Sequence, residues 1–179
     1  MLPFAHIAIA LVLFYIAGLA FPKIRPHINY WYVAVGSMLP DLIDKPVGIL
    51  LFADIFSSGR IFAHSLLFVG VLGVAGYYLY TRKKDARVLM LAGGSLIHQL
   101  LDGMWNTPVT FLWPLLGWEF QRRAYGSFWQ FLTGIYGKLG DISTLSILFL
   151  FMTELLGLAV IMLFVAGYLK KRVNDKKAK

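Results

Sequence analysis

The sequence predicts an all-α membrane protein with about five transmembrane spans, the second of them broken. Hydrophobic residues make up 59% of the 179 residues and charged residues only 15%, which is unlike the composition of soluble domains. Crossing ~30 Å of hydrocarbon takes about 20 helical residues, and five apolar runs reach or approach that length. We expect a single transmembrane domain over residues 1–169, followed by a basic cytoplasmic tail over residues 170–179.

The first two runs differ in regularity. Phe4–Phe21 is interpreted as a retained span because no Lys or Arg precedes it and no small-residue cleavage site follows it. Tyr30–Phe52 contains Pro40 and Pro46 as well as two aspartates, so we expect this span to be broken or kinked near its middle. Irregular backbone at membrane depth is tolerated only beside protein or a wet cavity.

The remaining runs are Phe62–Tyr80, the short Ala86–Leu101 and Ile142–Leu169. The short run suits a helix that ends at a site within the membrane. Between the fourth and fifth runs, the apolar stretch Thr110–Trp118 is too short to span and is expected to be re-entrant or interfacial. Four tryptophans fit a belt at headgroup level: Trp105, Trp113, Trp118 and Trp129.

The basic residues predict the orientation of the chain in the inner membrane. With the N-terminus outside and the C-terminus cytoplasmic, most of them fall on the cytoplasmic side, as the positive-inside rule requires. The basic residues left on the outer side are Lys45, Arg60, Arg122, Arg123 and Lys138. The net charge of +8 therefore reflects membrane orientation, and we expect no nucleic-acid partner. Nothing in the sequence predicts a protein partner.

Six ionisable residues of metal-ligand type lie in these apolar runs or directly after one of them: His6, Asp41, Asp44, His64, His98 and Asp102. A carboxylate or imidazole in hydrocarbon is costly unless something binds it. In the expected topology all six lie in the outer leaflet, although the basic residues alone set that topology. The simplest shared explanation is one or two divalent ions. Because the chain has no cysteine, nitrogen and oxygen are the ligands, which suits Zn first, with Mn or Fe as alternatives.

Spacing suggests how these residues act. His98 and Asp102, at i and i+4, share a helix face, and Asp41 and Asp44, at i and i+3, can share another. We expect Asp41, His64, His98 and Asp102 to be metal ligands, with His6 a weaker candidate. A bound ion lowers the pKa of a coordinated water to about 7, and Asp44 is the expected general base.

The outer-side cations predict how a substrate is held. Arg60 is expected to stabilise a phosphate or a developing oxyanion as a catalytic residue. Arg122, Arg123 and Ser65 are expected to contact the substrate. Glu154, in the middle of the last run, is a lesser candidate: a further ligand, a partner of a ligand histidine, or a protonated interior residue.

Three strings in this order resemble the signature of the YdjM-like membrane proteins. They are Gly-Ser-Met-Leu-Pro-Asp-Leu-Ile-Asp at 36–44, Arg-Ile-Phe-Ala-His-Ser at 60–65 and Leu-Ile-His-Gln-Leu-Leu-Asp at 96–102, followed by Thr107 and Leu112-Trp113-Pro114. The resemblance covers residues 1 to about 115. The chain departs from typical members at residues 61–63, where Gly-x-Thr is common before His-Ser.

That family is described as membrane-bound metal-dependent hydrolases. Its motifs are distantly similar to the helical zinc-dependent phospholipase C enzymes, which use His and Asp on packed helices. The resemblance implies that Asp41, His64, His98 and Asp102 are metal ligands, with His6 as a further one.

The expected function is hydrolysis of an amphiphilic lipid by a metal-activated water, with a phosphoester favoured by the outer arginines. The main enzymatic alternative is cleavage of an acyl-lipid amide or ester, resembling ceramidase-like membrane zinc enzymes. Metal transport with the same ligands is disfavoured, because the inner halves of spans one, three and four carry almost no ionisable groups. A non-catalytic membrane regulator with a structural metal stays open.

Overall fold

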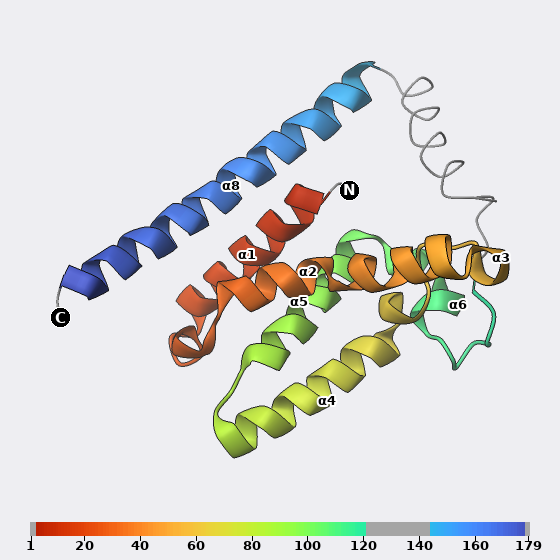
Figure 1. The fold of residues 1–179 in the computed structure, drawn as a ribbon, viewed down its shortest axis with the longest axis horizontal. Coiled ribbons are helices and arrows are strands. Elements are labelled where there is room, and N and C mark those ends of the chain that lie inside the picture. Colours follow the sequence, from red (N-terminus) through yellow and green to blue (C-terminus); the bar gives the residue numbers. More distant parts are fainter. Residues whose placement is uncertain (1–2, 121–143, 178–179) are drawn as a thin grey trace.

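The computed structural model describes residues 3–120 and 144–177, and every regular element in these residues is helical (Figure 1). The longer helices are α1 Pro3–Ala20, α2 Tyr30–Lys45, α4 Leu66–Lys83, α5 Arg87–Leu101 and α8 Thr144–Lys177. The shorter ones are η1 Arg25–His27, η2 Pro46–Leu51, α3 Ala53–Phe56, η3 Phe62–His64, η4 Met104–Asn106 and α6 Pro108–Phe111.

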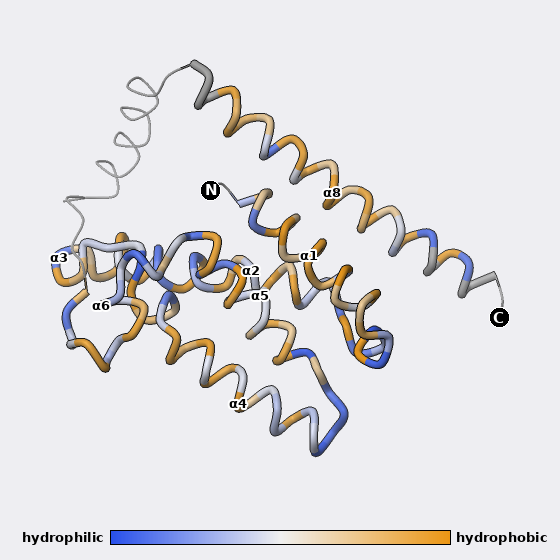
Figure 2. Tube along the Cα trace, turned by 180° about the vertical axis from the view of Figure 1, so that it is seen from behind, coloured by the Kyte–Doolittle hydropathy of each residue, from blue (hydrophilic) through white to orange (hydrophobic). Residues whose placement is uncertain are grey.

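The long helices alternate in direction. Phe4 packs on Gly157 and the Tyr15 ring meets Phe164, so α1 and α8 run parallel (Figure 1). α2 and α5 run the opposite way, and α4 returns in the direction of α1. The hydrophilic segments of the turn after α1, the α4–α5 turn and the end of α8 lie together, away from α3 and α6 (Figure 2). This alternation is what five consecutive membrane crossings would require.

Two helices among the described residues are long and apolar enough to cross a membrane. They are α1 and the segment Leu148–Lys170 of α8, and very little of the latter is buried against protein. α5 is apolar but shorter, and α2 and α4 do not meet the same criterion. The count of five spans therefore stays a prediction, whereas the all-helical fold is confirmed.

α2 and α5 cross through small residues. A Cβ atom at Gly36 would lie 2.5 Å from the Leu91 carbonyl oxygen, so only glycine fits at this crossing. Pro40 has no N–H, which leaves the Gly36 carbonyl without its helical donor. The Ser95 hydroxyl of α5 donates to that carbonyl at 3.0 Å. The proline thus frees an acceptor that a hydrogen bond between the helices uses.

The second span changes its helical geometry at Pro46, past the middle where the break was expected. α2 continues through Pro40 to Lys45, and the chain then widens into the π-helical turn η2 before the short α3. The return loop packs on this turn, because Ser58 N donates to the Gly48 carbonyl at 3.3 Å and a side chain at Gly48 would collide with the Ser58 carbonyl.

Two other boundaries differ from the predictions. α4 begins at Leu66, not at Phe62, because the Ser65 hydroxyl caps it by accepting from Phe68 N at 3.3 Å. α8 continues to Lys177, so the predicted tail is largely helical. In the stretch expected to be re-entrant, the short helix α6 is followed by a turn in which Trp113 packs against Phe62, with ring centroids 5.2 Å apart.

The tryptophan belt at headgroup level stays a prediction. Trp105 and Trp118 expose their rings, as an interfacial position would require, whereas Trp113 lies in an aromatic cluster. Trp129 falls outside the described residues.

Candidate metal centre

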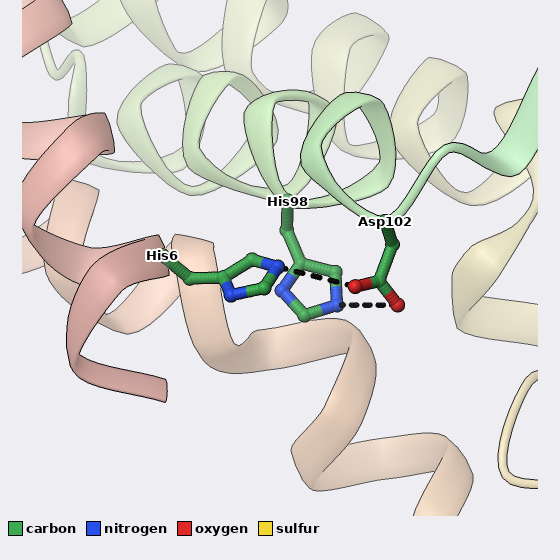
Figure 3. A group of neighbouring side chains, drawn as sticks. All are labelled: His6, His98 and Asp102. Atoms are coloured by element: carbon green, nitrogen blue, oxygen red, sulfur yellow. Dashed lines mark hydrogen bonds and ion pairs between the residues drawn. The ribbon is translucent and has the colours of Figure 1, made fainter. Parts of the chain in front are cut away.

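Seven predicted site residues from four parts of the chain meet at one end of the helical bundle. They are His6 on α1, Asp41 and Asp44 on α2, Arg60 and His64 in and after the loop that follows α3, and His98 and Asp102 at the end of α5. Figure 3 shows His6 from α1 pointing toward His98 and Asp102. The helix directions explain the meeting, because α1 and α4 begin where α2 and α5 end.

Asp44 fixes the position and tautomer of His64. Its Oδ2 accepts from His64 Nδ1 at 2.7 Å and from the backbone N–H groups of Ile61 at 2.7 Å and His64 at 3.1 Å. Its Oδ1 accepts from Ala63 N at 2.9 Å. Because the proton of the His64 ring is held on Nδ1 by this buried carboxylate, Nε2 presents a free lone pair.

His98 is oriented in the same way by a backbone group. Its Nδ1 donates to the Ser37 carbonyl at 2.7 Å, so its Nε2 also presents a lone pair. The Nε2 atoms of His98 and His64 lie 3.3 Å apart, and both side chains are buried. Two lone pairs facing each other away from water repel unless a cation lies between them. The donor set therefore fits a bound metal ion.

Two carboxylates complete this group. Asp41 Oδ1 lies 3.6 Å from His64 Nε2 and 3.9 Å from His98 Nε2. Asp102 Oδ2 lies 3.9 Å and 4.0 Å from the same two nitrogens. Ligands of a tetrahedral zinc ion at its usual bond lengths stand about 3.3–3.4 Å apart. The two nitrogens already have this spacing, and the carboxylates need to move inward by only a few tenths of an ångström.

His6 extends the site on the side of Asp102. Its Nε2 lies 3.2 Å from Asp102 Oδ1, and its ring centroid lies 4.7 Å from that of His98. Within the described residues, two groups could hold a metal ion: His6 with His98 and Asp102, and Asp41 with His64 and His98. His98 belongs to both, and its Nδ1 is already used by Ser37. Through Nε2 it can therefore bind only one ion.

Some supporting residues were not predicted from the sequence. The Gln99 amide donates to the carbonyls of Ala63 at 2.9 Å and Ser65 at 3.1 Å, and so holds the turn that carries His64. Lys45 pairs with Asp41, with Nζ 2.6 Å from Oδ2. The polarity of Gln99 within an apolar run is a signal that could have pointed to it. The Ser37 carbonyl and the backbone N–H groups around Asp44 carry no sequence signal.

Other predicted residues lie outside the metal-binding groups. Ser65 is buried, caps α4 and donates to the Phe62 carbonyl at 2.6 Å, which favours a structural role over substrate contact. The Glu154 carboxylate accepts from Phe4 N at 3.0 Å and Ala5 N at 3.1 Å, and so caps the first turn of α1. Arg122 and Arg123 fall outside the described residues.

The fold and this site define a helical protein that has two helices apolar enough to cross a membrane and a buried His/Asp group that could hold a metal ion. The sequence model of the YdjM inner membrane protein family matches residues 1–173, and the chain belongs to this family. The match confirms the resemblance seen in the three motifs. No curated protein and no solved structure matches the chain in the corresponding comparisons.

Proposed function

We propose that this protein is a membrane-embedded, metal-dependent hydrolase. The observation that carries the proposal is the pair of Nε2 atoms of His64 and His98, 3.3 Å apart, each with its Nδ1 hydrogen-bonded elsewhere. Orienting partners of this kind are typical of metal-binding histidines. When bound, a divalent ion would lower the pKa of a coordinated water to about 7 and polarise a phosphoryl or carbonyl oxygen.

The ligand set favours one ion per chain. His64, His98, Asp41 and Asp102 would supply four donor atoms, the reacting water would take a fifth position on the ion, and His6 is held against the far oxygen of Asp102. Imidazole and carboxylate together suit zinc, and manganese or iron less well. Because His98 has a single free nitrogen, two ions that both use it are disfavoured.

The structure favours a different role for Asp44 from the general base that we expected. Its oxygens already accept four hydrogen bonds, and its side chain is inaccessible to solvent. We assign it to orienting His64. Asp41 has the least buried side chain of the three carboxylates, at 18% exposed against 9% for Asp102 and 0% for Asp44. Its Oδ2, which pairs with Lys45 and not with the histidines, is therefore the carboxylate oxygen best placed to accept the proton of an attacking water while Oδ1 acts as ligand.

We propose an amphiphilic lipid substrate that carries a phosphoester. The site lies at one end of the bundle, α8 exposes a nearly continuous apolar surface, and Arg60 stands beside the ligands. In the reaction the water oxygen bonds to phosphorus, the ester P–O bond breaks, and the leaving oxygen takes up a proton. The proposed orientation has the N-terminus outside, the C-terminus cytoplasmic and the site in the outer leaflet.

The test is metal content followed by turnover. The detergent-purified protein, loaded with zinc or manganese, should hold about one equivalent, measured by mass spectrometry. The His98→Ala/Asp102→Ala double variant should lose it, whereas His27→Ala, which alters the histidine outside the cluster, should keep it. Release of a headgroup from a phosphoester lipid supports the proposal. Cleavage only of an acyl amide or ester favours the ceramidase-like alternative. A metal-loaded protein that cleaves neither the phosphoester nor the acyl lipid favours the non-catalytic regulator with a structural metal. No metal overturns the proposal.

A further inference from the structure

Each carboxylate that faces the two histidines is also paired with a cation. Lys45 Nζ lies 2.6 Å from Asp41 Oδ2, and Arg60 Nη2 lies 2.6 Å from Asp102 Oδ2. Lys45 is one helical turn after Asp41 on α2, whereas Arg60 comes from the loop after α3. Helix α2 and the loop after α3 thus each bring one cation to a different carboxylate of the same centre.

The cations are the most exposed charged groups of the cluster. The Lys45 side chain is 48% exposed and that of Arg60 27%, against 18% for Asp41 and 9% for Asp102. The histidine side chains behind them are 0% and 1% exposed. A molecule that approaches the ligand atoms from outside therefore meets Lys45 and Arg60 first.

The net charge of the cluster changes sign when a divalent ion binds. Three carboxylates, those of Asp41, Asp44 and Asp102, stand against two cations, which leaves one net negative charge when the imidazoles are neutral. A divalent ion converts this into one net positive charge. A largely buried net charge is unfavourable, so the metal-loaded site is best neutralised by a ligand with a single negative charge.

We propose that Lys45 and Arg60 form a clamp for a monoanionic phosphate group at the mouth of the metal centre. When the ion draws Asp41 and Asp102 inward, each cation exchanges a carboxylate for a phosphate oxygen. Guanidinium and ammonium groups both bind phosphate through charge-assisted hydrogen bonds. The inference rests on the proposed metal centre, adds Lys45 as a specificity-determining residue, and narrows the substrate to a phosphodiester rather than a neutral acyl amide.

The experiment measures metal affinity and anion affinity separately in the full-length protein. The test variants are Lys45→Gln and Arg60→Gln, and Lys45→Arg conserves the charge. The matched control is Lys83→Gln, because Lys83 is an exposed lysine at the end of α4 that lies away from the site. The probes are inorganic phosphate and a short-chain phosphatidylglycerol, titrated into zinc-loaded protein in a neutral detergent. Metal affinity is measured by competition with a chelating dye.

The clamp predicts that the glutamine variants lose anion affinity but keep or gain metal affinity. Anion affinity should fall about tenfold or more in each glutamine variant, the loss expected for one hydrogen bond between charged groups. Metal affinity should stay equal or rise, because the freed carboxylate no longer has a competing cation. A residue that only supports the fold would lower both. Lys45→Arg, which keeps the charge, should recover part of the anion affinity that Lys45→Gln loses, and Lys83→Gln should bind the anion as the unaltered protein does.

The outcomes separate this inference from the proposed function. Tighter binding of the lipid than of inorganic phosphate identifies a lipid headgroup as the ligand, and equal binding identifies free phosphate; both support the clamp. Normal metal binding with unchanged anion affinity in both glutamine variants overturns the clamp alone. The clamp is also overturned if the metal-free protein binds the anion as tightly as the zinc-loaded protein does. Failure of every variant and of the unaltered protein to bind metal overturns the proposed function as well.

Discussion

His64 and His98 face each other through Nε2 atoms 3.3 Å apart, from segments separated by 34 residues. Neither ring can turn its Nδ1 toward the other, because Asp44 and the Ser37 carbonyl hold those atoms at 2.7 Å each. The pair is therefore set up as two acceptors with no donor between them. The hydrogen bonds made by Asp44, by the Ser37 carbonyl and by Gln99 all support this arrangement.

Replacing Asp44 by Asn should weaken metal binding without removing a metal ligand. The amide keeps the volume of the carboxylate but cannot accept from His64 Nδ1 and the three backbone N–H groups together. Loss of such an orienting partner typically costs about 10- to 100-fold in metal affinity. A chelator competition assay measures it, with the exposed Asp54→Asn as control. Unchanged affinity would remove the orienting role from Asp44.

The Ser95–Gly36 hydrogen bond should depend on Pro40. Ser95→Ala leaves the Gly36 carbonyl without a donor at a buried helix crossing and should lower the free energy of unfolding by about 1–3 kcal/mol. Pro40→Ala restores the backbone N–H that normally bonds this carbonyl. In that background Ser95→Ala should cost less. A double-mutant cycle by thermal unfolding in detergent checks this, and additive effects would contradict it.

Gly36→Ala should destabilise the bundle and disturb the site together. Its Cβ atom would lie 2.5 Å from the Leu91 carbonyl oxygen and 2.7 Å from the Leu91 Cα, so α5 must move away from α2. Overpacking of this kind typically costs about 1–3 kcal/mol. Gly70→Ala is the matched control, since a Cβ there meets nothing within 4 Å. It should leave the melting temperature unchanged or raised, because alanine favours helix. Equal losses in the two variants would refute the close crossing.

Glu154→Gln should loosen the start of α1. The carboxylate accepts from the N–H groups of Phe4 and Ala5, two of the free donors at a helix N-terminus, where negative charge is also favourable. We expect a loss of about 1 kcal/mol and faster amide exchange at these two residues. The exposed Glu119→Gln provides the control. Exchange that stays slow in Glu154→Gln would show that α1 is capped by other means.

The meeting of the ligands could be predicted because it follows from helix ends. Once the long helices alternate, residues at the start of α1 and α4 and at the end of α2 and α5 lie at the same end of the bundle. The roles of individual carboxylates could not be predicted. Asp41 and Asp44 look alike in sequence, yet Asp44 is buried under backbone N–H groups whereas Asp41 pairs with Lys45.

The sequence alone determined the helical class, the family and the histidines and aspartates that could hold a metal ion. These polar groups could be recognised because they are costly in apolar runs. The tertiary structure decided what each residue does. It set the tautomers of His64 and His98, turned Glu154 and Ser65 into helix caps, and brought Lys45 to Asp41. The physical reason is that a hydrogen bond needs its donor and acceptor within about 3 Å of each other. Which groups come that close depends on how the backbone is placed in space, and the type of a residue alone does not reveal that.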